Sequence, residues 1–212
     1  MLLLFWMVVR MSNNASLRFY FGAMGCGKTR KLQGDYYSKI EDGFDAIIIK
    51  PIVDRKGDNN TLARDGGSIK VEMMISSNDN IYIMIANYLI NNNLDFILVD
   101  EAQFLESHHV DELSDIVDIL GINVYCYGLR TDFRGYLFDG SKRLFEVSDY
   151  LYEINRQCSC GNNKIYNMRL ENGIGVFDGS QIAIDGIDAI YESMCRKCYK
   201  NEKKKVLKKI KF

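Results

Sequence analysis

The stretch "FYFGAMGCGKTRKL", Phe19 to Leu32, decides the fold, because an apolar run leads into a glycine-rich turn before a helical pattern. Residues Gly22 to Thr29 fit the pattern G-x-x-x-x-G-K-[ST]. Glycine allows successive backbone N–H groups to turn inward around phosphate oxygens, where a Cβ atom would obstruct them. The following helix adds the dipole of its N-terminus. The stretch therefore predicts a phosphate-binding loop (P-loop) between a buried strand and a helix, although a purely structural glycine turn is the alternative.

In a P-loop the last two residues of the pattern have separate tasks. Lys28 reaches the β- and γ-phosphates of a nucleoside triphosphate, and the Thr29 hydroxyl ligates Mg²⁺. The remaining contacts come from the loop as a whole, so the expected ATP and phosphate contacts are Gly22, Ala23, Met24, Gly25, Cys26, Gly27, Lys28 and Thr29. This pattern predicts ATP together with magnesium.

A second phosphate-site element is expected in "FILVDEAQF", Phe96 to Phe104, where four apolar residues precede two carboxylates. Asp100 ends the predicted strand and is the expected Mg²⁺ partner, as in other P-loop proteins. Glu101 follows at the edge of the sheet where ligands of such folds bind. A carboxylate there can take the proton from an attacking hydroxyl group or water, so Glu101 is the predicted base. The alternatives are a strand-end turn for Asp100 and a helix-terminal charge for Glu101.

Apolar runs alternate with helical patterns over residues 15–155, the predicted nucleotide-binding domain. Strands are expected at 17–21, 44–51, 94–100 and 122–128, helices near 29–40, 79–92 and 110–120, and a loop at 54–69. Strands separated by helices indicate an α/β fold, here a RecA-like parallel sheet with crossover helices on its faces.

The two ends of the chain differ from this domain. Residues 1–14 form an expected extension whose first nine residues are apolar but too few for a bilayer span of about 20 residues. Either Met11 is the natural start or the apolar residues pack as an arm. Residues 156–199 contain four of the six cysteines and are predicted to form a small second domain. The lysine-rich residues 200–212 indicate a frayed helix or a disordered end, with a site for an acidic partner as the alternative.

The cysteines of the second domain occur as Cys158-x-Cys160 and Cys195-x₂-Cys198. The second pair has zinc-knuckle spacing, and four thiolates make a closed tetrahedral site. The first pair is one residue tighter than usual, so free thiols or a disulfide remain open from the pattern alone. Because no export signal precedes the domain, a reducing, cytoplasmic compartment is expected, which disfavours disulfides.

The other cysteines and the two histidines have no metal-site spacing. Cys126 is expected to be buried in a strand, and Cys26 is either an oxidation-sensitive thiol or a small side chain that fits the turn. His108 and His109 are interpreted as ordinary residues at the start of a helix.

The charge balance and motifs leave three functional classes. A kinase is the first, an ATP-dependent motor that acts on nucleic acid through a zinc domain is the second, and a nucleotide-binding module without catalysis is the third. The net charge of −1 provides no basic field for nucleic acid. Intact Lys28, Thr29, Asp100 and Glu101 argue against lost catalysis.

Several segments together resemble the type II (cellular-type) thymidine kinase family. In order, these are "GAMGCGKT", "IIIKPIVD", "LARDGG", "ILVDEAQFL", "YGLRTDFRGYLFDGSKRL" and "YESMCRKCY", from about Leu17 to Tyr199. The resemblance implies transfer of the γ-phosphate of ATP to the 5′-hydroxyl of thymidine, or of deoxyuridine, in nucleotide salvage. It also implies a homotetramer, feedback inhibition by thymidine triphosphate (dTTP), and neither a membrane nor a nucleic-acid partner.

The resemblance also assigns site residues. Glu101 would deprotonate the 5′-hydroxyl, and Asp100 would assist the metal. Thymidine would contact Met24, Leu129, Phe133 and Tyr191, and the backbone around Ile182 and Ala183. A structural Zn²⁺ held by Cys158, Cys160, Cys195 and Cys198 would anchor both ends of a lasso that folds over the substrate.

Four departures from the family pattern stand out. Ala23 and Gly25 replace a proline and a large residue, and Arg130 replaces an acidic residue. The segment 55–57 does not align with the usual arginine of the family. The pattern therefore does not identify the positively charged side chain that stabilises the transition state. One extra residue between Gly186 and Tyr191 leaves the register of the lasso uncertain by one.

Overall fold

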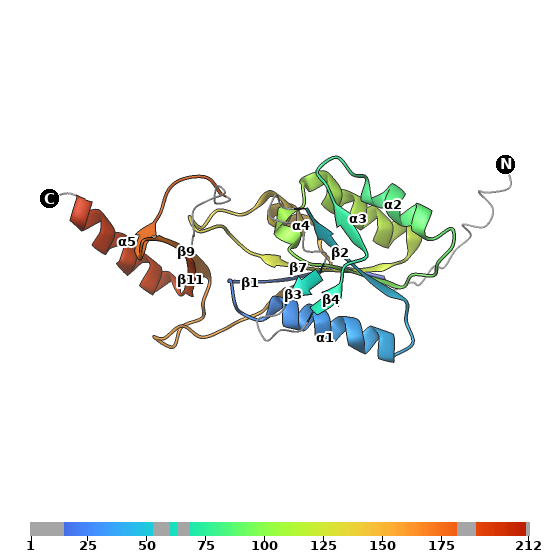
Figure 1. Ribbon diagram of the computed structural model, residues 1–212, viewed down its shortest axis with the longest axis horizontal. Helices are drawn as coiled ribbons and strands as arrows, with labels where there is room; N and C mark the ends of the chain where they lie inside the picture. Colours follow the sequence, from blue (N-terminus) through green and yellow to red (C-terminus); the bar gives the residue numbers. More distant parts are fainter. Residues whose placement is uncertain (1–14, 53–59, 63–67, 182–189, 211–212) are drawn as a thin grey trace.

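The computed structural model describes residues 15–52, 60–62, 68–181 and 190–210. Its centre is a six-stranded sheet in the order β5-β2-β6-β7-β1-β8, and every neighbouring pair is parallel (Figure 1). The strands are β1 (Leu17–Gly22), β2 (Ala46–Pro51), β5 (Met73–Ile75), β6 (Phe96–Val99), β7 (Asn123–Leu129) and β8 (Tyr150–Glu153). The predicted parallel sheet is therefore confirmed, with β5 and β8 as two edge strands that the sequence patterns did not indicate.

Helices cover both faces of this sheet. They are α1 (Lys28–Glu41), α2 (Ile81–Tyr88), α3 (Ser107–Leu120) and α4 (Asp139–Val147), with a short 3₁₀ helix η1 (Ala102–Phe104). In Figure 1, α1 lies on one side and α2, α3 and α4 lie on the other. Successive residues of β6 follow this division, since Leu98 packs with Leu32 of α1 whereas Val99 packs with the side of α2 and α3. The continuous apolar run of β6 thus fits a strand buried on both faces.

The segment expected as a loop at 54–69 contains regular structure. Strands β3 (Asn60–Leu62) and β4 (Ser68–Lys70) pair in antiparallel fashion, so the loop prediction was wrong for these residues. Their pairing comes from backbone hydrogen bonds in a separate two-stranded sheet. Because such a ribbon need not bury an apolar face, its sequence carries no alternating hydrophobic pattern.

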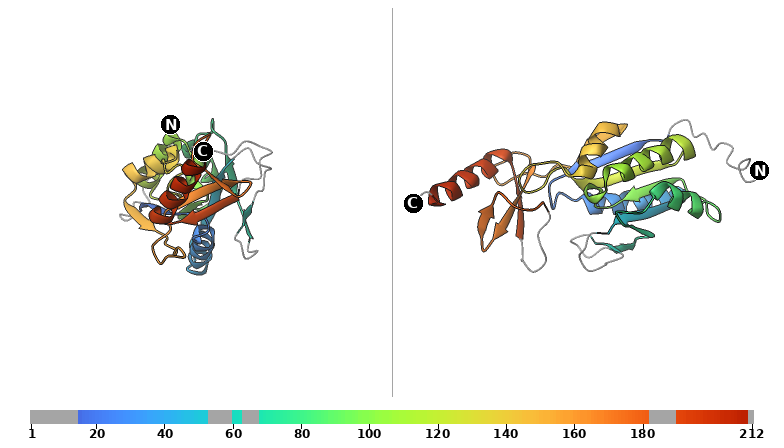
Figure 2. Two further views of the ribbon diagram at one scale, coloured as in Figure 1. Left: turned by 90° about the vertical axis from the view of Figure 1, so that its left-hand side faces the viewer. Right: turned by 90° about the horizontal axis from the view of Figure 1, so that it is seen from above.

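The C-terminal part forms a separate layer, here called the cysteine lobe (residues 156–210 as described). An antiparallel sheet in the order β10-β9-β11 consists of β9 (Tyr166–Glu171), β10 (Ile174–Val176) and β11 (Ile190–Met194). Helix α5 (Arg196–Ile210) follows, and Figure 2 shows it at the end of the molecule beyond the central sheet. Cys158, Met168, Met194, Cys195 and Tyr199 form the core of the lobe.

Helix α5 crosses the position where the sequence suggested that a tail begins, between 199 and 200. The lysine-rich end is helical through residue 210 and mostly exposed through Lys208, which agrees with a solvated helix. Within the described residues, no helix combines the length and the apolar character that crossing a membrane requires.

Candidate active site

The turn between β1 and α1, here called the glycine turn (Gly22–Gly27), is shaped by left-handed backbone. Gly25 has φ 68° and Gly27 has φ 97°, backbone angles that residues other than glycine rarely adopt. The Nζ atom of Lys28 turns back and donates a hydrogen bond to the Ala23 carbonyl at 2.9 Å. The turn therefore brings its lysine and its backbone to one place, at the carboxyl end of β1.

Asp100 lies directly after β6 and is 4% exposed. Its Oδ1 accepts the N–H of Glu101 at 3.0 Å. Burial and the neighbouring Glu101 raise the pKa of Asp100 to about 7, while Lys50 and Lys28 oppose this rise. Asp100 thus offers a buried carboxylate at the carboxyl end of β6, and carboxylate oxygens are ligands that Mg²⁺ prefers.

Glu101 occupies a strained position at the start of η1. Its φ of 51° is in the left-handed region, which is uncommon for a residue with a Cβ atom. Its Oε2 accepts a hydrogen bond from the Nε2 of Gln103. The Oε1 of the same glutamine accepts the N–H of Leu129 at 2.8 Å, at the end of β7. Gln103 thus ties the predicted base to the neighbouring strand.

One pocket brings together all four described side chains that were expected to contact thymidine: Met24, Leu129, Phe133 and Tyr191. The space between its walls is about 520 Å³, a volume that includes the part open to solvent. Phe104 and Phe138 add further aromatic walls. Ile182 and Ala183 lie outside the described residues, as does the 55–57 segment.

The pocket also has polar walls that the sequence patterns did not single out. Asp132 is 2% exposed and accepts hydrogen bonds from Arg134 Nε at 2.9 Å and Nη2 at 2.7 Å. Gln181 donates to the same carboxylate at 3.3 Å, and Arg134 Nη1 donates to the Gly179 carbonyl at 2.9 Å. Asp132 therefore holds the chain on both sides of the pocket.

Asn167 on β9 is a polar side chain that touches the glycine turn. Its Oδ1 accepts the Met24 N–H at 2.7 Å, and its Nδ2 donates to the Thr131 carbonyl at 3.3 Å. The signal for Asn167 in the sequence is weak, because a single asparagine in a strand pattern has no spacing motif. Arg130, which departs from the family pattern, is exposed and does not line the pocket.

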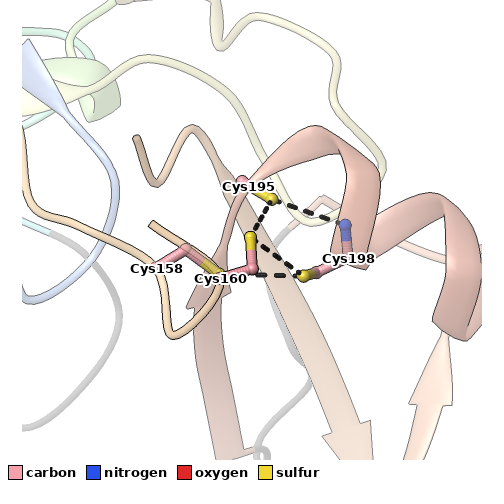
Figure 3. Close-up of side chains that lie close together, drawn as sticks. All are labelled: Cys158, Cys160, Cys195 and Cys198. Atoms are coloured by element: carbon pink, nitrogen blue, oxygen red, sulfur yellow. Dashed lines mark hydrogen bonds between the residues drawn. The ribbon is translucent and has the colours of Figure 1, made fainter. Parts of the chain in front are cut away.

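The four cysteines of the lobe converge in space, as Figure 3 shows. Their Sγ atoms all lie within 4.8 Å of one another, with Cys160 to Cys195 at 3.4 Å, Cys160 to Cys198 at 3.6 Å and Cys158 to Cys198 at 3.9 Å. Four thiolates about 2.3 Å from a tetrahedral zinc ion would be about 3.8 Å apart. Hydrogen bonds from the backbone of Cys195 and Cys160 lower the pKa of Cys158 to about 6, which favours its thiolate. The cluster fits a structural zinc site.

Comparison with known proteins agrees with this geometry. A family model described as "Thymidine kinase" matches residues 15–199, which include the glycine turn, the pocket and the four cysteines. The chain belongs to the thymidine kinase family. The thymidine kinase of Pasteurella multocida (strain Pm70) is 41% identical to it over 190 residues, which cover 89% of this chain and 98% of the relative. Those of Shewanella oneidensis (38%, 88% and 97%) and Legionella pneumophila strain Paris (37%, 88% and 90%) are similarly close.

Membership of the thymidine kinase family accounts for the order of the segments along the chain. The match ends at residue 199, within α5. The lysines of α5 beyond this residue therefore lie outside the part of the chain that the family model covers.

Proposed function

We propose that this protein is an ATP:thymidine 5′-phosphotransferase that forms thymidine monophosphate in nucleotide salvage. One observation carries the proposal: Met24 belongs both to the glycine turn and to the apolar pocket. A nucleoside in this pocket would therefore lie directly beside the phosphates of a nucleotide held by the turn. The relatives are named thymidine kinases, which supports thymidine as the acceptor of the phosphate. Deoxyuridine is a second candidate acceptor.

In this proposal the glycine turn acts as a P-loop. Its backbone N–H groups and Lys28 bind the phosphates of ATP, and Thr29 and Asp100 hold Mg²⁺. The metal, when bound, neutralises charge that develops on the phosphate oxygens. The carboxylate of Asp100 is buried, and the charge of Lys28 acts to lower its pKa, which fits this role.

Glu101 is the proposed base. Its carboxylate takes the proton of the thymidine 5′-hydroxyl as the O5′–Pγ bond forms, and the bond between Pγ and the bridging oxygen breaks to release ADP. The hydrogen bond from Gln103 goes to Oε2, and no hydrogen bond to Oε1 is found among the described residues, so Oε1 is the proposed acceptor of this proton. The Glu101 side chain thus supplies the proton acceptor, and the P-loop supplies the alignment.

The pocket would recognise the base mainly by shape. Met24, Leu129, Phe133 and Tyr191 provide apolar and aromatic walls that suit a flat methylated ring. Backbone groups around Ile182 and Ala183 are proposed to bind the polar edge of the pyrimidine. Zn²⁺ on the four cysteines would anchor both ends of the lasso between Gly161 and Met194.

The first experiment is phosphorylation of a panel of deoxynucleosides with ATP and Mg²⁺, comparing wild type with Glu101→Gln. Thymidine monophosphate formed by wild type and nearly lost in Glu101→Gln supports both acceptor and base. Glu146→Gln is the matched control, because Glu146 is an exposed partner of Arg143 on α4. ATP turnover without a labelled nucleoside product, stimulated by DNA or RNA, would instead favour the nucleic-acid ATPase.

Three further properties are proposed from the family alone. We expect a homotetramer, inhibition by dTTP and a cytoplasmic location. Light scattering of the purified protein tests the first, and thymidine phosphorylation measured with added dTTP tests the second.

A further inference from the structure

We propose that the cysteine lobe positions the P-loop itself, through Asn167 and Arg156, and so keeps the phosphate site in register with the nucleoside pocket. The lobe would then do more than anchor a substrate-covering segment. The proposal rests on the proposed role of the glycine turn in binding ATP, and the idea of register rests in addition on the proposed phosphorylation of thymidine.

Asn167 makes the first contact. Its side chain is buried, with the residue 2% exposed, and it reaches the P-loop from a position 143 residues later in the chain. One carboxamide serves both parts of the site, since it accepts from the Met24 N–H and donates to the Thr131 carbonyl. A side chain without polar atoms would leave a partly buried donor and a buried acceptor unpaired, which is costly. Asn167 therefore links the P-loop to the segment that carries Phe133.

Arg156 makes the second contact. Its Nη1 donates to the Gly25 carbonyl at 2.8 Å. The Met24 N–H and the Gly25 carbonyl belong to the peptide units on either side of the Met24–Gly25 peptide. Hydrogen bonds on both sides restrain this peptide, where Gly25 takes its left-handed conformation and no proline stiffens the turn.

The lobe is itself held against the pocket by hydrogen bonding and packing. Its two contacts to the P-loop, from Asn167 and Arg156, therefore come from a fixed position. The Tyr199 hydroxyl donates to the Phe133 carbonyl at 2.7 Å, and this bond is buried. The Tyr199 ring stacks on Tyr166 with centroids 4.4 Å apart. Tyr199 directly follows Cys198 of the cysteine cluster. The cysteine cluster, the pocket and the P-loop are thus joined through one layer of the lobe.

The test measures how tightly the zinc-loaded protein binds a non-hydrolysable ATP analogue with Mg²⁺ in the absence of thymidine. Asn167→Leu removes both hydrogen bonds at similar volume, and Arg156→Met removes the exposed donor with little risk to folding. Two controls match them. Met168→Ala truncates a neighbouring core residue of β9. Lys164→Met removes one positive charge from the same part of the lobe, as Arg156→Met does. Among the described residues, the Lys164 side chain makes no hydrogen bond to the P-loop.

We expect Asn167→Leu to raise the Kd for the analogue roughly 10-fold or more, and Arg156→Met to raise it by roughly 5-fold. Met168→Ala should lower the melting temperature while this Kd stays within about twofold of wild type, as for Lys164→Met. In turnover, KM for ATP should rise in both test variants, which lost stability alone would not cause.

An unchanged Kd for the analogue in both test variants would overturn the proposal, even if the KM for thymidine rises. If Asn167→Leu does not fold, Arg156→Met and Lys164→Met decide the question by themselves. The proposed function fails separately, when wild type binds the analogue but forms no thymidine monophosphate. In that case the effect of Asn167→Leu and Arg156→Met on the Kd for the analogue still tests the positioning role of the lobe.

Discussion

The Nε2 of Gln103 donates a hydrogen bond to Glu101, and the same side chain accepts the N–H of Leu129. Gln103 itself is buried, with 2% of its surface exposed, and both bonds are partly buried. The proposed base is therefore oriented by a neutral amide whose other end is fixed on β7.

We predict that Gln103→Leu lowers kcat roughly 10- to 100-fold, because a misplaced base loses alignment with the hydroxyl group. KM for ATP should change little, since Gln103 makes no described contact to the glycine turn. Steady-state kinetics with both substrates check this. A KM effect for ATP as large as the kcat effect would contradict an orienting role.

Close packing of α4 on η1 leads to a second prediction. A Cβ atom on Gly140 would meet the carbonyl oxygens of Leu105 at 2.5 Å and Ala102 at 2.7 Å. Gly140→Ala should destabilise the fold by about 1–3 kcal/mol and lower kcat, because η1 must move with Glu101 at its start. Gly34→Ala is the control, since a Cβ there meets nothing within 4 Å.

In helix α1, Gly34→Ala should stabilise the protein by about 0.5–1 kcal/mol. Chemical denaturation of both variants gives the two signs. Equal stabilisation by the two changes would show that helix propensity, rather than the approach of α4 to η1, controls the result.

The cysteine cluster predicts a metal dependence that can be separated from simple loss of folding. Cys198→Ser should reduce bound zinc below one ion per chain, lower the melting temperature and raise the KM for thymidine, because Tyr199 holds Phe133. Metal analysis by mass spectrometry, thermal denaturation and steady-state kinetics measure these three effects. Cys126→Ala, in the core of β7, should lower stability with zinc content unchanged.

His109 gives a pH dependence whose direction follows from its partners. Its Nδ1 accepts the Glu106 N–H at 3.3 Å, and its Nε2 lies 3.1 Å from the Asp79 carbonyl, which suits a neutral ring protonated at Nε2. Burial lowers the pKa of His109, with His108 acting in the same direction and Glu112 and Glu106 opposing it. The unfolded chain keeps the ordinary pKa of about 6.5, so it binds the proton first as the pH falls.

Stability contributed by His109 should therefore be present above pH 6.5 and be lost as the pH falls toward the lower pKa of the folded state. Urea unfolding at pH 7.5 and 5.5 measures the difference. The difference should shrink in His109→Gln and persist in His108→Gln, because His108 is about half exposed. An identical pH dependence in wild type and His109→Gln would exclude this residue as its source.

Local patterns revealed those parts of the molecule whose function is contained in a short stretch. The glycine turn, the buried strand before Asp100 and the burial of Cys126 each depend on neighbours in sequence, and all appear as expected. The cysteine pairs also converge, although 34 residues separate Cys160 from Cys195. The proposed catalytic and thymidine-binding roles stay predictions until they are measured.

Other features depend on partners that no local pattern encodes. Asn167 acquires its position from Met24 and Thr131, which lie 143 and 36 residues away. Strand β8 was missed because all four of its side chains are exposed, so it shows no alternation of apolar and polar residues. It is a strand because the backbone of β1 offers it parallel hydrogen bonds.

The direction of β1 has a practical consequence. The strand begins at Leu17, at the amino-terminal end of β1, and the glycine turn follows its carboxyl end. About 17 Å of extended backbone separates these two ends. A sensor surface attached upstream of Ala15 would thus be joined to the edge of the sheet remote from both pocket and turn. Immobilising the protein from that end would leave the pocket and the glycine turn open to solution, so the two proposed ligands, a nucleotide and a nucleoside, can be titrated on the same captured molecules.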